Sequence, residues 1–153
     1  TNPMLSSDAF RLLTWGSALT RMERVHRLAG YPVLTENIRV CWLGTDPGRN
    51  CGVCEKCIRT KLNFMAAGIR IPAGLGAVPG FLDILGLVAE RRQKIDFLAE
   101  IAKAGRHGPM PAGTQLALVL SIWKNRLLRP FRNLRRVRRN IGRWLRGRPL
   151  RQH

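Results

Sequence analysis

The chain has 153 residues and a formal net charge of +18. Its length is sufficient for one domain with a buried core, and no apolar run is long enough to cross a membrane as a helix. Residues 1–100 carry 13 Lys/Arg and all nine Asp/Glu, whereas residues 101–153 carry 14 Lys/Arg and no acid. These counts predict a nearly neutral body followed by a basic tail.

The first predicted helix spans residues 17–30. Leu19, Met22 and Val25 recur at helical spacing, with arginines on the opposite face, and Gly30 ends the pattern. After a short turn, residues 38–43 are apolar and β-prone, which predicts one short strand with Cys41 on it or just after it. Gly, Asp-Pro-Gly and Asn in residues 44–50 predict a loop.

Four cysteines then crowd one short window, in the order Cys41-x9-Cys51-x2-Cys54-x2-Cys57. Two-residue gaps let a tight turn present thiolates to one metal, and Gly52 lets the backbone fold closely around it. Four sulfurs fill the coordination shell of zinc, which predicts a structural Zn²⁺ site. Two alternatives are an iron–sulfur cluster, also held by four cysteines, and a redox dithiol formed by the last two of them. The dithiol leaves the other two cysteines unexplained.

Helices dominate the remaining predictions. A helix over 54–67 has Cys57 in its first turn, and the glycines and prolines of 68–80 predict a connector. Residues 81–104 predict one helix or two short ones, then a linker over 105–113 and a final helix over 114–145, bent or restarted at Pro130. The residues expected to face a core are Leu82, Leu85, Val88, Ile95, Leu98 and Ile101. The predicted fold class is mainly α, with a four-cysteine zinc knuckle and at most one short strand.

The motif Asn50-Cys-Gly-Val-Cys-Glu-Lys-Cys-Ile-Arg-Thr60, with the helix beginning Leu19-Thr-Arg-Met-Glu upstream, resembles the C-terminal part of 7-cyano-7-deazaguanine synthase and its relatives. These proteins belong to the adenine nucleotide alpha hydrolase (PP-loop ATP pyrophosphatase) superfamily. The resemblance covers residues 19–68, and the cysteine element is its specific part. Arg59 follows the last cysteine sooner than in that family, and the ATP-binding Ser-Gly-Gly-x-Asp-Ser loop does not occur in this chain.

The resemblance implies that the four cysteines bind one zinc. It also implies that ATP is used only together with a nucleotide-binding domain preceding Thr1, so that this chain alone has no complete active site. We therefore expect a processed product or fragment, the C-terminal part of a larger α/β nucleotide-binding fold. Its expected organisation is a PP-loop-like segment over 1–70 with the knuckle at 41–57, a helical extension over 71–110, and a basic amphipathic helix and tail over 111–153.

Other candidate functional residues are basic or aromatic. Arg59 is a candidate contact for substrate or phosphate, against a salt bridge as the simpler interpretation, and Trp42 is expected to cover the knuckle. The final helix alternates apolar residues with arginines at helical spacing. Its candidate contacts to nucleic acid or an anionic surface are Arg129, Arg132, Arg135, Arg136, Arg138, Arg139, Arg143 and Arg146.

Three interpretations of this basic helix stay open. It docks on the preceding domain with its arginines facing water, or it binds RNA phosphates, or it lies on an anionic membrane surface. The last two would make the chain a non-enzymatic zinc-knuckle module. Clustered cysteines without a secretory signal predict a reducing, cytoplasmic location, peripheral to a membrane if the helix binds lipid.

Overall fold

The computed structural model describes residues 7–10, 18–42, 46 and 48–144, and the side chains among these as far as residue 132. Within them the chain forms α1 (Arg21–Ala29), α2 (Pro32–Glu36), α3 (Glu55–Ala66), a 3-10 turn η2 (Ala73–Leu75), α4 (Phe81–Leu85), α5 (Arg92–His107) and α6 (Ala112–Trp144). No strand occurs in this described part. The mainly helical class predicted from the sequence is confirmed.

The predicted strand over 38–43 is wrong for the residues that are described. Residues 38–41 have no strand partner, and the side chain of Asn50 takes the place of one. Its Oδ1 accepts from the N–H of Val40 at 2.9 Å, and its Nδ2 donates to the carbonyl of Ile38 at 2.8 Å. An apolar, β-prone segment forms a strand only where a neighbouring backbone pairs with it.

Local signals explain where the helices begin. Thr20 caps α1 by accepting from the N–H of Glu23 at 3.2 Å, while the Glu23 carboxylate accepts from the N–H of Thr20 at 2.6 Å. Asp83 accepts from the N–H of Gly80 at the start of α4.

Helix α6 continues through Pro130, whose missing N–H leaves one helix hydrogen bond unmade.

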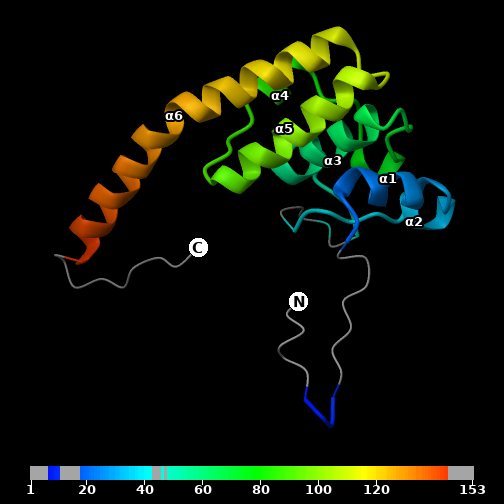
Figure 1. Cartoon of the computed structure of the whole chain (residues 1–153), viewed down its shortest axis with the longest axis horizontal. Helices are drawn as coiled ribbons and strands as arrows, with labels where there is room; N and C mark the ends of the chain where they lie inside the picture. Colours follow the sequence, from blue (N-terminus) through cyan, green and yellow to red (C-terminus); the bar gives the residue numbers. More distant parts are fainter. Residues whose placement is uncertain (1–6, 11–17, 43–45, 47, 145–153) are drawn as a thin grey trace.

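Four helices enclose the main core. Helix α6 runs along one side of α3, α4 and α5, and its C-terminal part extends beyond them, whereas α1 and α2 lie at the opposite side (Figure 1). The buried Ile and Leu side chains of this core are Ile58, Leu62, Ile84, Leu87, Ile95, Leu98, Ile101, Leu118 and Ile122. A second, smaller cluster joins Val25 of α1, Phe64 of α3 and Leu75. Helix α3 contributes to both clusters and therefore links them.

Two residues expected in the core are exposed instead. Leu82 is 77% exposed and Val88 is 46% exposed, whereas Ile84 between them is fully buried. Helix α4 ends at Leu85, and residues 87–90 are not helical. A prediction that treats residues 81–104 as one continuous helix therefore places Leu82 and Val88 on the buried face, although the helix is interrupted after Leu85.

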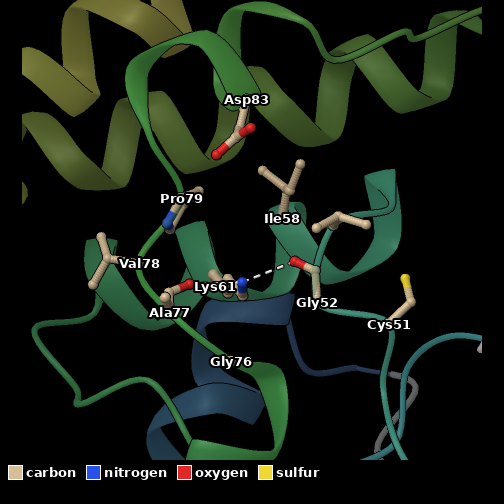
Figure 2. A pocket seen from close by; sticks show the side chains of 10 residues that line it. Cys51, Gly52, Ile58, Lys61, Gly76, Ala77, Val78, Pro79 and Asp83 are labelled. Atoms are coloured by element: carbon tan, nitrogen blue, oxygen red, sulfur yellow. Dashed lines mark hydrogen bonds between the residues drawn. The ribbon is translucent and has the colours of Figure 1, made fainter.

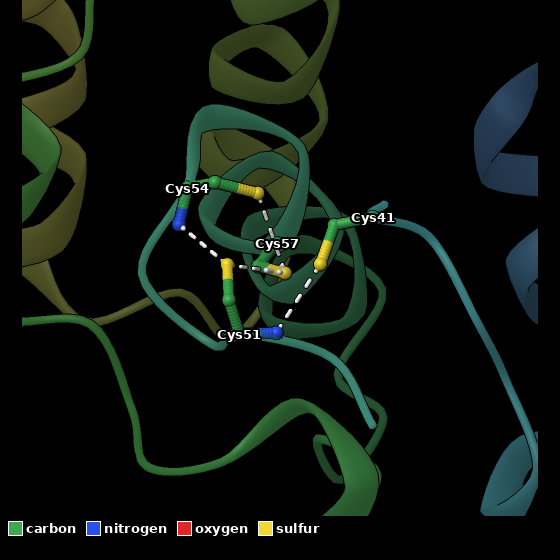
Figure 3. A group of neighbouring side chains, drawn as sticks. All are labelled: Cys41, Cys51, Cys54 and Cys57. Carbon is green, nitrogen blue, oxygen red and sulfur yellow. Dashed lines mark hydrogen bonds between the residues drawn. The ribbon is translucent and has the colours of Figure 1, made fainter. Parts of the chain in front are cut away.

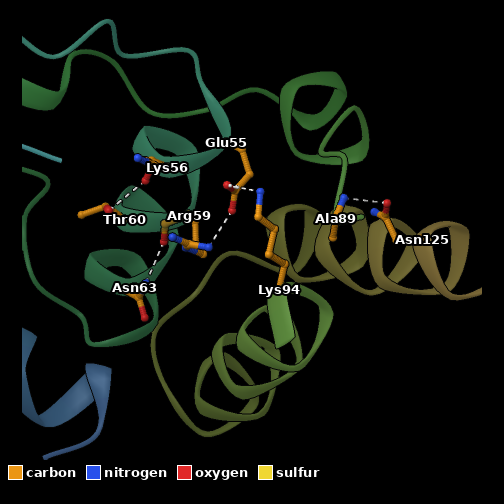
Figure 4. Close-up of polar contacts among 8 residues, drawn as sticks. All are labelled: Glu55, Lys56, Arg59, Thr60, Asn63, Ala89, Lys94 and Asn125. Carbon is orange, nitrogen blue, oxygen red and sulfur yellow. Dashed lines mark hydrogen bonds and ion pairs between the residues drawn. The ribbon is translucent and has the colours of Figure 1, made fainter. Parts of the chain in front are cut away.

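Polar contacts attach α6 to the non-helical segment that follows α4. Asn125 is fully buried; its Oδ1 accepts from the N–H of Ala89, and its Nδ2 donates to the carbonyl of Leu87, each at 2.9 Å (Figure 4). Lys124 donates to the carbonyl of Leu85. Burial lowers the pKa of Lys124. These bonds satisfy backbone groups that would otherwise be buried without partners.

Candidate metal centre

The four cysteines converge on one point. Their Sγ atoms all lie within 4.8 Å of one another, with 3.9 Å between Cys51 and Cys57 and 3.6 Å between Cys54 and Cys57 (Figure 3). All four are free thiols; Cys41 and Cys57 are buried, and the other two are half-buried. The prediction that these residues form one cluster is confirmed.

The geometry fits one tetrahedral metal ion. Sulfurs about 2.3 Å from a zinc ion form a tetrahedron with edges of about 3.8 Å. The two Sγ–Sγ distances of 3.6 and 3.9 Å lie on either side of that value. A four-iron cluster would give each iron its own thiolate and would hold the sulfurs further apart. The arrangement is therefore consistent with a closed four-sulfur zinc site.

Backbone geometry around the cysteines explains their convergence. Cys54 is the N-cap of α3, which places Cys57 in the first turn with its sulfur beside that of Cys54. Gly52 has a φ of 76°, a left-handed conformation that favours glycine. The N–H of Cys51 donates to the Sγ of Cys41 at 3.2 Å, and the N–H of Cys54 donates to the Sγ of Cys51 at 3.4 Å. Such N–H donors stabilise thiolate sulfur.

Asn50 fastens the first ligand to the other three. Besides its two bonds to residues 38 and 40, its Nδ2 donates to the carbonyl of Gly74 at 3.0 Å. One amide side chain thereby joins the segment before Cys41, the loop before Cys51 and the 3-10 turn. The sequence placed Asn50 in a turn and at the start of the cysteine motif but predicted no structural role for its side chain.

Lys61 is the second polar residue that sequence reasoning missed. It is only 4% exposed, and its Nζ donates to the carbonyl of Gly52 at 2.8 Å and to the carbonyl of Ala77 at 2.7 Å (Figure 2). It also lines a pocket of about 250 Å³ beside the knuckle, together with Cys51 and Asp83. Its place one helical turn after Cys57, on the same face of α3, is the signal that points to the site.

Charge would give Lys61 a further role if the four cysteines hold zinc. One Zn²⁺ with four thiolates would carry two negative charges, and the buried ammonium group bonded to Gly52 of the knuckle loop would partly offset them. The two carbonyl acceptors offset the cost of burying the ammonium group. Lys61 therefore joins the knuckle loop to the 76–80 segment.

Burial controls how the thiols hold their protons. It raises the pKa of Cys54 and Cys57 above the ordinary thiol value. Burial also works to raise the pKa of Cys51, but the N–H groups of Val53 and Cys54 outweigh it and leave that pKa lowered. A metal ion must displace the protons held by these thiols, so metal binding releases protons and weakens in acid.

Arg59 lies in an ion-pair network on the other face of α3. Its Nη1 lies 2.7 Å from Oε1 of Glu55, whose Oε2 lies 3.3 Å from the Nζ of Lys94 on α5 (Figure 4). Its guanidinium also stands 5.5 Å from the centre of the Phe97 ring. This network connects α3 to α5, so the contacts described for Arg59 are within the fold, and its contact with a substrate stays a prediction.

Trp42 does not cover the knuckle. Its side chain is 80% exposed, which corrects the expectation that it packs on the cysteines. Cys41, by contrast, is buried and its sulfur belongs to the cluster. The guanidinium of Arg39 stands 6.0 Å from the Trp42 ring.

The predicted basic contacts are described only in part. The side chain of Arg129 is half-buried, and Nη1 of Arg132 donates to Oδ1 of Asn125 at 2.8 Å. For Arg135, Arg136, Arg138, Arg139 and Arg143 the structure describes only the backbone, which is helical, and Arg146 lies outside the described residues. Their role at an anionic partner stays a prediction.

Fold and site together define a mainly helical protein with a cluster of four cysteines suited to a metal ion. Comparison with protein-family models, with curated proteins and with solved structures gave no match. The resemblance to the synthase family therefore depends on the motif residues alone.

Proposed function

We propose that Cys41, Cys51, Cys54 and Cys57 bind one structural zinc ion in the C-terminal part of an ATP-dependent enzyme resembling 7-cyano-7-deazaguanine synthase. The observation that carries the proposal is the convergence of four Sγ atoms within 4.8 Å. Four thiolates leave zinc no open position for water or substrate. The ion therefore shapes the fold, and catalytic groups come from elsewhere in the enzyme.

The position of the cluster supports a scaffolding role. Zinc would join the segment at Cys41 to the start of α3, and α3 contributes side chains to both apolar clusters. The metal would thereby attach the segment at Cys41, which is non-helical in its described residues, to the central helix. Because the ligands come from two separate segments, metal binding stabilises the folded chain over the unfolded one.

Two local features support the enzyme resemblance. The Thr-Arg-Met-Glu segment of the motif begins α1, where Thr20 and Glu23 form a reciprocal cap. The cysteine motif follows one short helix later and begins α3. In this proposal a preceding nucleotide-binding domain binds ATP and activates a carboxylate, and the zinc-bearing part forms one wall of its site.

Metal content tests the zinc assignment. We expect about one zinc per purified chain by elemental mass spectrometry, and a clear loss of zinc in Cys54→Ser because three thiolates leave the shell incomplete. Lys56→Ala, at an exposed position between two ligands, is the matched control and should retain the metal. Full zinc retention in Cys54→Ser would contradict the assignment of Cys54 as a zinc ligand. Iron together with acid-labile sulfide would show that the cysteines hold an iron–sulfur cluster instead of zinc.

The enzyme assignment has a separate test. The coding sequence ahead of Thr1 should contain the Ser-Gly-Gly-x-Asp-Ser loop, and the protein that includes it should release pyrophosphate from ATP when its carboxylate substrate is present. An initiating methionine close to Thr1, with no such loop, would contradict the enzyme assignment and leave the zinc site standing.

A further inference from the structure

The outer face of α6 carries a row of large apolar side chains that are exposed in the described part of the chain, which we name the α6 stripe. Its members are Leu116 (55% exposed), Leu120 (42%), Trp123 (58%), Leu127 (65%) and Phe131 (66%). Their spacings of four, three, four and four residues place them along one side of the helix. The stripe therefore continues over four turns of α6.

The opposite side of the same helix faces the core. Ala117, Leu118, Ser121 and Asn125 are fully buried there. The core therefore accounts for one side of α6 and leaves the stripe in water. Single exposed leucines are normal on protein surfaces, but a continuous row of this length indicates a surface that another phase or molecule covers.

The charge of this region selects an anionic partner. Residues 101–153 carry 14 Lys/Arg and no Asp or Glu. Arg126 is exposed beside the stripe, and the C-terminal part of α6 extends beyond the body of the molecule (Figure 1). A partner must therefore offer negative charge next to apolar volume.

A lipid surface offers both, whereas RNA offers only the first. Leucine side chains gain free energy by leaving water for an apolar medium, and a phosphate backbone provides none. At a bilayer, arginines meet headgroup phosphates while Leu, Trp and Phe enter the boundary of the acyl chains. No helix in the described part of the chain has the length and hydropathy needed to cross a bilayer, so such a helix would lie in the interface.

We propose that the α6 stripe lies flat on an anionic lipid surface, with its apolar side chains in the acyl boundary and Arg126, at the edge of the stripe, on the headgroups. This proposal depends on α6 alone and is independent of the ligand set at the metal centre. In addition to belonging to the proposed enzyme, the chain would bind a membrane surface through α6.

Vesicle co-sedimentation tests the proposal with the full chain, after its zinc content has been measured. We expect binding to vesicles of phosphatidylcholine mixed with phosphatidylglycerol and little binding to phosphatidylcholine alone. Leu120→Ser combined with Leu127→Ser should weaken binding at least tenfold, because both side chains belong to the stripe. Val33→Ser combined with Leu34→Ser is the matched control, an exposed apolar pair on α2 that should leave binding unchanged.

Three outcomes would overturn the proposal. Equal vesicle binding by the stripe variant would show that charge alone holds the chain on lipid. A chain that binds neither vesicle would exclude a lipid surface as the partner. RNA binding that the same two leucine substitutions abolish, without vesicle binding, would assign the stripe to nucleic acid. Circular dichroism of each variant checks that α6 is intact, since all four substituted positions are exposed.

Discussion

Lys61 shows how a residue outside the four-cysteine cluster can hold the segments around it together. Its ammonium group bonds to carbonyls on both sides of the pocket beside the knuckle, 9 and 16 residues away in the chain (Figure 2). Asn50 acts in the same way on the other side of the cluster, with acceptors as far as Gly74. The local pattern of cysteines predicted the ligands, whereas these bonds depend on segments brought together only by folding.

We predict that Lys61→Met destabilises the zinc-loaded chain by about 1–3 kcal/mol, because the carbonyls of Gly52 and Ala77 lose the charged donor supplied by a buried side chain. Methionine retains the apolar volume of the side chain, so the effect reports mainly on the ammonium group. Urea denaturation measures the free energy of unfolding, and transfer of zinc to a chelator should be faster than in the parent chain. Lys56→Met makes the same change at an exposed position of α3 and should alter stability by less than about 0.5 kcal/mol. Equal behaviour of the two variants would contradict the role of Lys61.

Asn125 has a comparable role away from the metal. Replacing it by alanine leaves the N–H of Ala89 and the carbonyl of Leu87 buried without their partners. Each such group costs about 1–3 kcal/mol, so we expect Asn125→Ala to lower the free energy of unfolding by about 2–4 kcal/mol in urea denaturation. Arg126→Ala, at the exposed neighbouring position, is the control, and a similar loss in both variants would contradict this assignment.

At the scale of the elements, helix α3 was predictable and the segments around it were less so. Its limits follow from a ligand at the N-cap and a glycine after the last turn, both of which are local signals. The sequence did not predict where the helix is interrupted between α4 and α5. The non-helical backbone there is stabilised by Asn125, which lies 36 residues from Ala89 in the chain. For the same reason Leu82 and Val88 were assigned to the wrong face.

The turn between α5 and α6 gives a prediction at this scale. A Cβ atom added at Gly108 would overlap the carbonyl oxygen of Ala66 at the end of α3. Because that oxygen belongs to the backbone, the two elements would have to separate. We expect Gly108→Ala to lower the free energy of unfolding by about 1–3 kcal/mol, measured by chemical denaturation.

Gly113 offers a matched control in the first turn of α6. A Cβ atom there meets nothing within 4 Å. Alanine is the better helix former, so Gly113→Ala should raise the free energy of unfolding by up to about 1 kcal/mol. The two Gly→Ala changes should therefore have opposite signs, and a stabilised Gly108→Ala variant would show that α3 and the turn do not pack as described.

At the scale of the whole molecule, the chain combines a helical core, a four-cysteine cluster and a long C-terminal helix with one exposed apolar side. The fold class and the clustering of the four cysteines followed from the sequence because helical periodicity and cysteine spacing are local patterns. The exposed α6 stripe did not, since the same spacing of Trp123, Leu127 and Phe131 also describes a helix docked on another domain. The structure is needed to show which side of α6 packs on the core and which side is exposed.

Zinc K-edge X-ray absorption on the purified chain would decide whether the four cysteines together bind one zinc ion, because it counts the sulfurs around the metal and measures their distance. We expect about one zinc per chain with four sulfur neighbours at about 2.3 Å and no oxygen or nitrogen bound to the ion. A first shell with fewer than four sulfurs, or a spectrum that requires a second metal nearby, would contradict a closed structural site at Cys41, Cys51, Cys54 and Cys57.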